Sequence, residues 1–100
     1  MDDVKLKLNE KNNGAFYIMD GEEQLGQMVI SVTGSKLTVY HTEVSPTAQG
    51  KGLAKLLLNA MVEFARETKR SVVPLCPYVH AQFKRHPADY ADVWRQQNAD

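Results

Sequence analysis

A glycine-paired loop is the first feature of this sequence whose residue types and spacing suggest chemistry. It reads Gln-Gly-Lys-Gly-Leu-Ala and leads directly into a stretch with the periodicity of an amphipathic helix. Gly50 and Gly52 have no side chains, so a ligand can approach the backbone closely. The first N–H groups of a helix lack intrahelical partners and attract anions, above all phosphates. The predicted anion site consists of Gln49, Gly50, Lys51, Gly52, Leu53 and Ala54.

Two interpretations of this loop stay open on its own sequence. It lacks both the G-x-G-x-x-G pattern and the lysine-serine end of a P-loop, so neither nucleotide-binding fingerprint applies. The loop is either a cradle for a phosphate or a simple glycine turn ahead of a surface helix.

The second feature is Cys76, the only cysteine of the chain. It stands immediately before Pro77, which suits the first position of a helix, so Cys76 is predicted to be the N-cap. The helix dipole favours a thiolate there, which suggests a nucleophile or an acyl acceptor. Lys84 and Arg85 would add positive charge if the helix presents them inward. The alternative is an inert core cysteine.

The three histidines, His41, His80 and His86, do not have the spacing of metal ligands, so we expect no metal site. By strict alternation His41 falls on the inward face of its strand, together with Leu37 and Val39. The pattern therefore predicts a buried, hydrogen-bonded histidine in preference to a general base.

The elements that position these residues follow from periodicity. Alternating or β-branched patterns predict strands at residues 4–8, 15–19, 24–32 and 36–43, with a hairpin turn at Asp20-Gly21. Helical spacing from Leu53 to Phe64 predicts the helix, and residues 72–75 predict a strand parallel to the one before it. Two further helical stretches are expected at residues 78–85 and 88–97. The fold class is thus α/β, with a mixed, mostly antiparallel sheet, a β-α-β crossover and C-terminal helices.

Length and composition limit the possible classes of protein. One hundred residues predict a single domain spanning 1–100. The formal net charge of zero argues against a nucleic-acid partner, which requires a basic face. No long apolar run is present, so we expect no membrane partner. A single cysteine favours a reducing compartment, and we expect a cytoplasmic protein.

Taken together, these residues resemble the GNAT superfamily of N-acetyltransferases, in particular its small single-domain branch. The resemblance covers roughly residues 36–90, and its segments are specific jointly, whereas the glycine loop alone would not be. The segments are His41-Thr42-Glu43-Val44, Gln49-Gly50-Lys51-Gly52-Leu53-Ala54, Val73-Pro74-Leu75-Cys76-Pro77-Tyr78-Val79, and Lys84-Arg85-His86-Pro87 with Tyr90.

The resemblance implies that acetyl-coenzyme A is the cofactor and that its pyrophosphate lies on the loop from Gln49 to Ala54. Its pantetheine arm would run beside Thr42, Glu43 and Val44, where their strand splays from the one that ends at Cys76. The resemblance also implies cofactor contacts for Tyr78 and Lys84, although Tyr78 alone is more typical of a packing residue. The small branch has a cysteine that matches Cys76, proposed to lie near the cofactor thiol.

The sequence departs from the family pattern in two places. Thr47 occupies the loop position where the family has arginine or glutamine, which removes a side-chain contact to the cofactor. The chain begins with strands, whereas larger members have N-terminal helices that help to form the acceptor site. The acceptor pocket is therefore open, shared with a partner chain in a homodimer, or absent.

The resemblance implies an N-acetyltransferase that transfers an acetyl group from acetyl-coenzyme A to an amine of unknown identity. Cys76 either relays the acetyl group or only lines the site while the amine attacks directly. The alternative function is a non-catalytic coenzyme A-binding module that senses or scaffolds.

Overall fold

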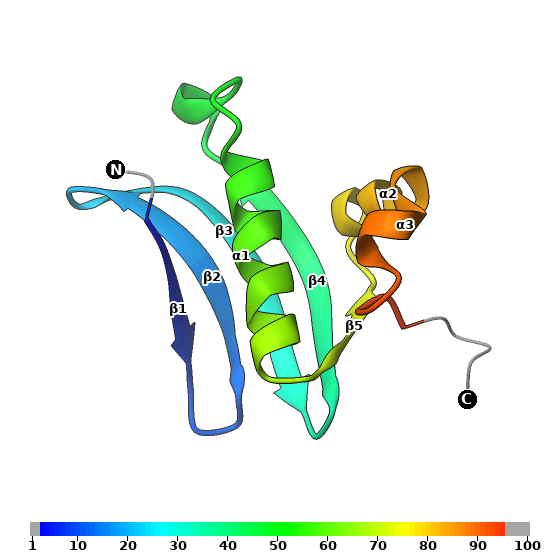
Figure 1. Ribbon diagram of the computed structural model, residues 1–100. Coiled ribbons are helices and arrows are strands. Elements are labelled where there is room, and N and C mark those ends of the chain that lie inside the picture. Colours follow the sequence, from blue (N-terminus) through cyan, green and yellow to red (C-terminus); the bar gives the residue numbers. More distant parts are fainter. Residues whose placement is uncertain (1–2, 96–100) are drawn as a thin grey trace.

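The computed structural model describes residues 3–95, in which helix α1 lies across one face of a five-stranded sheet (Figure 1). We call the face that α1 covers the inner face and the opposite one the outer face. The elements in chain order are β1 (Val4–Leu8), β2 (Asn13–Asp20), β3 (Glu23–Thr33), β4 (Lys36–Val44), the 3-10 helix η1 (Pro46–Ala48), α1 (Leu53–Glu67), β5 (Ser71–Pro74), α2 (Pro77–Arg85) and α3 (Pro87–Tyr90).

The sheet has the mixed topology that the sequence predicts. Its strand order is β1-β2-β3-β4-β5, the first four strands pair antiparallel, and β5 runs parallel to β4. Gly21 and Gly34 form the two tight connections with φ angles of 64° and 58°, which glycine adopts without strain. The α/β prediction, including the β-α-β crossover through α1, is confirmed.

A β-bulge in β4 decides which side chains face the core. Val29 lies opposite His41 while Ile30 lies opposite Val39, so Tyr40 is an extra residue without a partner on β3. The extra residue reverses the alternation beyond it. The prediction that His41 faces the interior is therefore wrong: its side chain is 60% exposed on the outer face.

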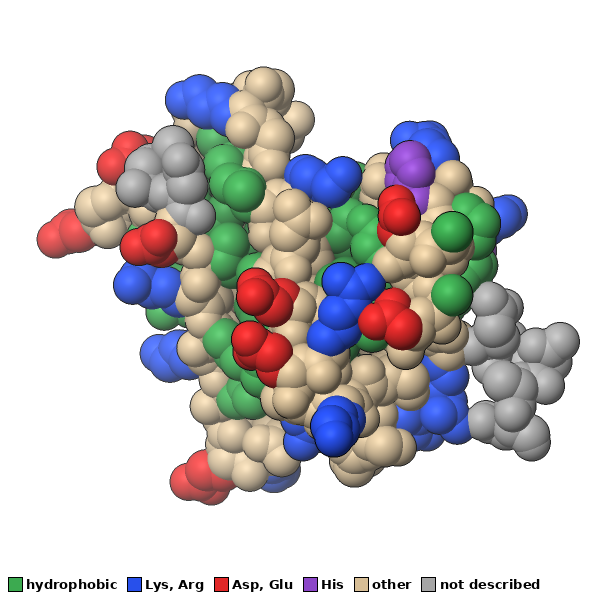
Figure 2. Space-filling view, viewed as in Figure 1, with side chains coloured by type: hydrophobic (Ala, Val, Ile, Leu, Met, Phe, Trp, Pro, Cys, Tyr) green, Lys and Arg blue, Asp and Glu red, His purple; other side chains and the backbone are tan. Residues whose placement is uncertain are grey.

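The buried face of helix α1 is shifted from the apolar stripe that the helical spacing predicts. Leu53, Leu57 and Met61 of that stripe are buried, whereas Leu56, Ala60 and Phe64 are only partly buried. Leu58 and Val62 are buried as well, because the C-terminal segment docks beside the helix near Tyr90. Arg66 ties this segment down, since its Nε donates to Asp92 Oδ2 at 2.8 Å. Figure 2 shows acidic and basic side chains meeting where α1 adjoins the C-terminal helices.

The last helix is shorter than predicted. The sequence predicts helix through residues 88–97, but α3 ends at Tyr90, and residues 96 and 97 lie outside the described part of the chain. After α3 the chain joins the free edge of β5: Val72 N–H donates to the Val93 carbonyl and Arg95 N–H donates to the Val72 carbonyl. These bonds satisfy edge groups that a continued helix would leave unpaired. Trp94 then packs near Phe83, with ring centroids 5.8 Å apart.

Within residues 3–95, no helix is both long and apolar enough to span a bilayer.

Candidate functional site

The β4–β5 junction opens where the family resemblance implies that the two strands splay. The two strands pair from Lys36 and Ser71 as far as Val39 and Pro74, and Cys76 N–H donates to the Val39 carbonyl at 2.9 Å. Beyond this point β4 continues to Val44 alongside β3, whereas β5 has ended. In the described residues, the last part of β4 therefore has no strand on the β5 side, and its backbone can pair with a ligand there.

Cys76 lies at the closed end of this gap, at the N-cap of α2 as predicted. The cysteine is free and only 2% exposed. Its Sγ is 3.2 Å from Thr42 Oγ1, a hydrogen bond in which either atom can donate. Thr42 is opposite the buried Met28, so the bulge turns it inward toward the thiol. The structure thus joins two residues that the sequence placed at the site separately.

Tyr78 stands near Cys76 in the first turn of α2 and is half-buried. Burial raises the pKa of the Tyr78 phenol, and the neighbouring Tyr90 and Cys76 raise it further because each could carry negative charge. The phenol therefore holds its proton more tightly than a tyrosine in solvent does, and it can serve as a hydrogen-bond donor.

The glycine loop has the backbone geometry of an anion cradle. Gly50 and Gly52 have φ angles of 81° and 75°, and a Cβ added at either position would meet no atom within 4 Å. Gly52 is the N-cap of α1, and no side chain caps the helix. Among the described residues, no acceptor pairs with the N–H groups from Gly50 to Lys55. The loop thus offers open space in front of unpaired donors, which fits a pyrophosphate.

Side chains around the loop fix its position. Gln49 Nε2 donates to the Val44 carbonyl at 3.0 Å, which joins the loop to the end of β4. Thr47, at the position where the family has arginine or glutamine, hydrogen-bonds Glu23 Oε2 at 3.3 Å. The Leu53 side chain is buried, so this residue offers only its backbone to a ligand. Lys51 is exposed and adds positive charge at the rim.

Lys84 and Arg85 do not face the thiol. Helix α2 buries Val79 and Phe83 and leaves both cations exposed. The condition under which they would add charge at the thiol is therefore not met, because the core-facing positions of the helix are apolar. A contact between Lys84 and a cofactor stays a prediction.

The pair His41–Glu43 is a functional candidate that alternation reasoning missed. His41 Nε2 lies 2.9 Å from Glu43 Oε1, and the two side chains are 60% and 56% exposed. Both point to the outer face, so the Glu43 side chain lies away from Thr42 and Cys76. The i, i+2 spacing on a strand could have revealed the pair, but only the bulge explains why it faces solvent.

Comparison with known proteins agrees with this geometry. Residues 15–93 match the family of GCN5-related N-acetyl-transferases, and since the match spans more than half of the chain, the protein belongs to that family. The fold is similar to the solution structure of a GCN5-like protein from Staphylococcus aureus, proposed to be an N-acetyltransferase. The TM-score is 0.63 at 30% identity, over 99% of this chain and 97% of the other.

A second similar structure is the crystal structure of nourseothricin acetyltransferase. The TM-score is 0.56 at 27% identity, over 80% of this chain and 52% of the other, so this chain corresponds to about half of that enzyme. A search of curated proteins found no match.

Proposed function

We propose that this protein binds acetyl-coenzyme A in the β4–β5 gap and transfers its acetyl group to an amine. The observation that carries the proposal is the loop of Gly50 and Gly52, whose unpaired N–H groups lie at the end of the strand that borders the gap. Family membership supports the same cofactor, because GNAT proteins typically use acetyl-coenzyme A. The free thiol of Cys76 favours action in the reducing cytoplasm.

The residues of the chain divide the work of binding. The N–H groups from Gly50 to Ala54 would hold the pyrophosphate, and Lys51 would add charge at the rim. The unpaired edge of β4 near Thr42 and Val44 would hold the extended arm through backbone hydrogen bonds. When bound, the cofactor would supply an acetyl group activated as a thioester.

We assign roles in the transfer step to two groups. His41 Nδ1 would take a proton from an incoming ammonium, while the Nε2–H of the same ring donates to Glu43 Oε1, which holds the ring in place. The Tyr78 phenol, whose pKa is raised by burial, would hold its proton and donate a hydrogen bond from its hydroxyl. An amine would then arrive at the gap from the face opposite to the thiol.

Calorimetry and thermal unfolding with acetyl-coenzyme A test the binding step. Saturation at about 100 times Kd should add about 2.7 kcal/mol of stability. No calorimetric heat and no thermal shift at millimolar ligand would refute the proposal.

Turnover is tested by coenzyme A release in the presence of small amines and lysine peptides. Release that depends on the acceptor supports a transferase. Binding without release for any acceptor would favour the non-catalytic coenzyme A-binding module.

A further inference from the structure

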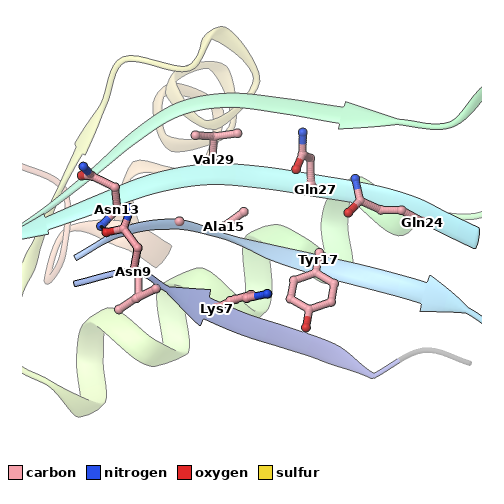
Figure 3. A pocket seen from close by; sticks show the side chains of 10 residues that line it. Lys7, Asn9, Asn13, Ala15, Tyr17, Gln24, Gln27 and Val29 are labelled. Atoms are coloured by element: carbon pink, nitrogen blue, oxygen red, sulfur yellow. Dashed lines mark hydrogen bonds between the residues drawn. The ribbon is translucent and has the colours of Figure 1, made fainter. Parts of the chain in front are cut away.

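The outer face of the sheet holds a groove of about 560 Å³, and no residue of the glycine loop lines it. Figure 3 shows Tyr17 from β2 and Gln24, Gln27 and Val29 from β3 lining it, with Lys7 at the β1 side. These residues alternate with the buried Phe16, Ile18 and Met28, so their side chains lie on the face opposite to α1.

Strand register connects this groove to the His41–Glu43 pair. Lys5 pairs with Tyr17, Tyr17 with Gln27, and Gln27 with Glu43, so these four residues form one straight row across four strands. We call it the outer row. Three strand spacings separate its ends, a distance of about 14 Å. An extended polypeptide covers that distance in about four residues.

The outer row has opposite charges at its two ends. Lys5 is exposed at the β1 edge, and the Glu43 carboxylate is exposed at the β4 end. Between them lie an aromatic ring and an amide, and the amides of Gln24 and Asn13 line the same groove. Amide side chains both donate and accept hydrogen bonds, so they match a peptide backbone.

The shape of the groove also favours a chain over a small molecule. Sites for small molecules usually enclose most of their ligand, whereas this groove lies open on the sheet surface. Tyr40, held on the outer face by a 2.8 Å hydrogen bond to Ser31, is 47% exposed beside the same groove. Aromatic side chains presented in this way are typical of surfaces that bind polypeptides.

We propose that the outer row docks the acceptor as an extended polypeptide, with the acetylated lysine at Glu43 and an acidic residue about four positions away at Lys5. This inference rests on the proposed transferase function and specifies its acceptor. Glu43 attracts the ammonium to the β4 end, and Lys5 fixes the register of the bound segment.

Three probes test the charge pattern: a blocked dodecapeptide with one lysine and a glutamate four residues away, the same peptide with glutamine in place of glutamate, and n-butylamine. We expect kcat/KM for the glutamate peptide to exceed that of the glutamine peptide about threefold, the scale of one exposed ion pair. Lys5→Gln should abolish this difference. Asn59→Ala, on the exposed side of α1, is the matched control and should preserve it.

Binding is measured independently of turnover by amide chemical shifts of the labelled protein with the glutamate peptide. Shift changes should follow β1, β2 and β3 on the outer face, and Tyr17→Ala should weaken them. Lys5 is exposed, so Lys5→Gln keeps the test valid if Tyr17→Ala unfolds the protein. Shift changes confined to the inner face, or equal peptide rates in the parent, would overturn the inference.

Two other outcomes separate the inference from the function it rests on. Peptide shifts on the outer face without any acetyl transfer would refute the transferase and leave the docking surface standing. A dimer in light scattering that dissociates on Tyr17→Asp would mean that a second copy covers this face, and that result would overturn the inference.

Discussion

The two sides of β4 near its bulge differ in solvent exposure and in the kind of side-chain contact that they hold. On the inner side, Thr42 Oγ1 and Cys76 Sγ form a 3.2 Å contact around a thiol that is 2% exposed. On the outer side, His41 and Glu43 form a 2.9 Å pair with more than half of each side chain in solvent. Within three successive residues of β4, Thr42 thus makes the inner contact to Cys76, while His41 and Glu43 form the solvated pair. The extra residue Tyr40, just before them, sets the face on which each of these side chains lies.

This difference predicts that variants on the two sides of β4 will have different effects on stability and on function. An exposed ion pair contributes about 0 to 1 kcal/mol, so the outer pair is nearly dispensable for folding. Buried polar contacts depend strongly on their surroundings, so changes on the inner side should affect both packing and ligand binding. We therefore expect inner-side variants to alter cofactor binding and outer-side variants to alter the reaction with the acceptor.

The largest expected effect concerns the loop that serves the inner side. Gly50→Val should weaken acetyl-coenzyme A binding about 100-fold, because its side chain would fill the space in front of the backbone donors. The positive φ also strains valine, at a cost of about 1 to 2 kcal/mol. Gly34→Val carries the same strain at an equally open turn, so it should lose similar stability and keep full affinity. Equal losses of affinity in both variants would place the phosphate elsewhere.

A second prediction concerns the role of the inner thiol. In a relay, Cys76 sulfur attacks the acetyl carbon, the thioester bond breaks, and the coenzyme A thiolate leaves and takes up a proton. The amine then attacks acetyl-Cys76 and restores the thiol. We favour direct attack by the amine, because the Cys76 sulfur is buried and already hydrogen-bonded to the Thr42 hydroxyl. Cys76→Ala should then cost about tenfold or less in kcat.

Intact-protein mass spectrometry from milliseconds to minutes distinguishes the two routes. Direct attack predicts no acetyl adduct when acetyl-coenzyme A is mixed with the parent in the absence of an amine. Thr42→Val keeps the thiol and removes its partner, so it serves as the matched variant. An adduct at Cys76 together with a nearly inactive Cys76→Ser would establish the relay instead.

A third prediction places the outer pair in the reaction with the acceptor. Glu43→Gln should lower kcat/KM for the amine about fivefold, since it removes the carboxylate that accepts the His41 hydrogen bond and attracts the ammonium. It should change stability by less than about 0.5 kcal/mol and leave the Kd of acetyl-coenzyme A unchanged. Glu63→Gln, exposed on α1, controls for loss of a carboxylate. A tenfold weaker Kd for Glu43→Gln would show that Glu43 serves the cofactor, and the division between the two sides would fail.

The sequence predicts the fold of this protein much better than it predicts which site residues of β4 face the inner side and which face the outer side. Period-2 and period-3.6 patterns locate the strands and α1 because one face of each is apolar, and Pro77 marks the start of α2. The bulge at Tyr40 has no such signal: the extra residue is set by pairing with β3, and it turns His41 outward and Thr42 inward. The early end of α3 also depends on a tertiary contact, because the chain near Trp94 pairs with the free edge of β5.

The smallest expected effect concerns the Tyr78 phenol on the inner side, which should hold its proton more tightly than a phenol in solvent. Burial, with the proximity of Tyr90 and Cys76, raises the pKa of Tyr78, so the folded protein binds this proton more tightly than the unfolded chain does. The associated stability is fully present below the unfolded pKa of about 10 and is lost as pH rises through the folded pKa. Tyr78→Phe removes that loss, so its stability should decline less on alkaline titration, by less than about 1 kcal/mol for a half-exposed group.

Urea unfolding of parent and variant from pH 7 to 11 measures the difference, and the pH 7 values supply the baseline for the lost hydroxyl. Parallel curves for the two proteins would mean that the Tyr78 phenol ionises as it does in solvent, and the contrast between a dry inner side and a wet outer side would then rest on Cys76 and Thr42 alone.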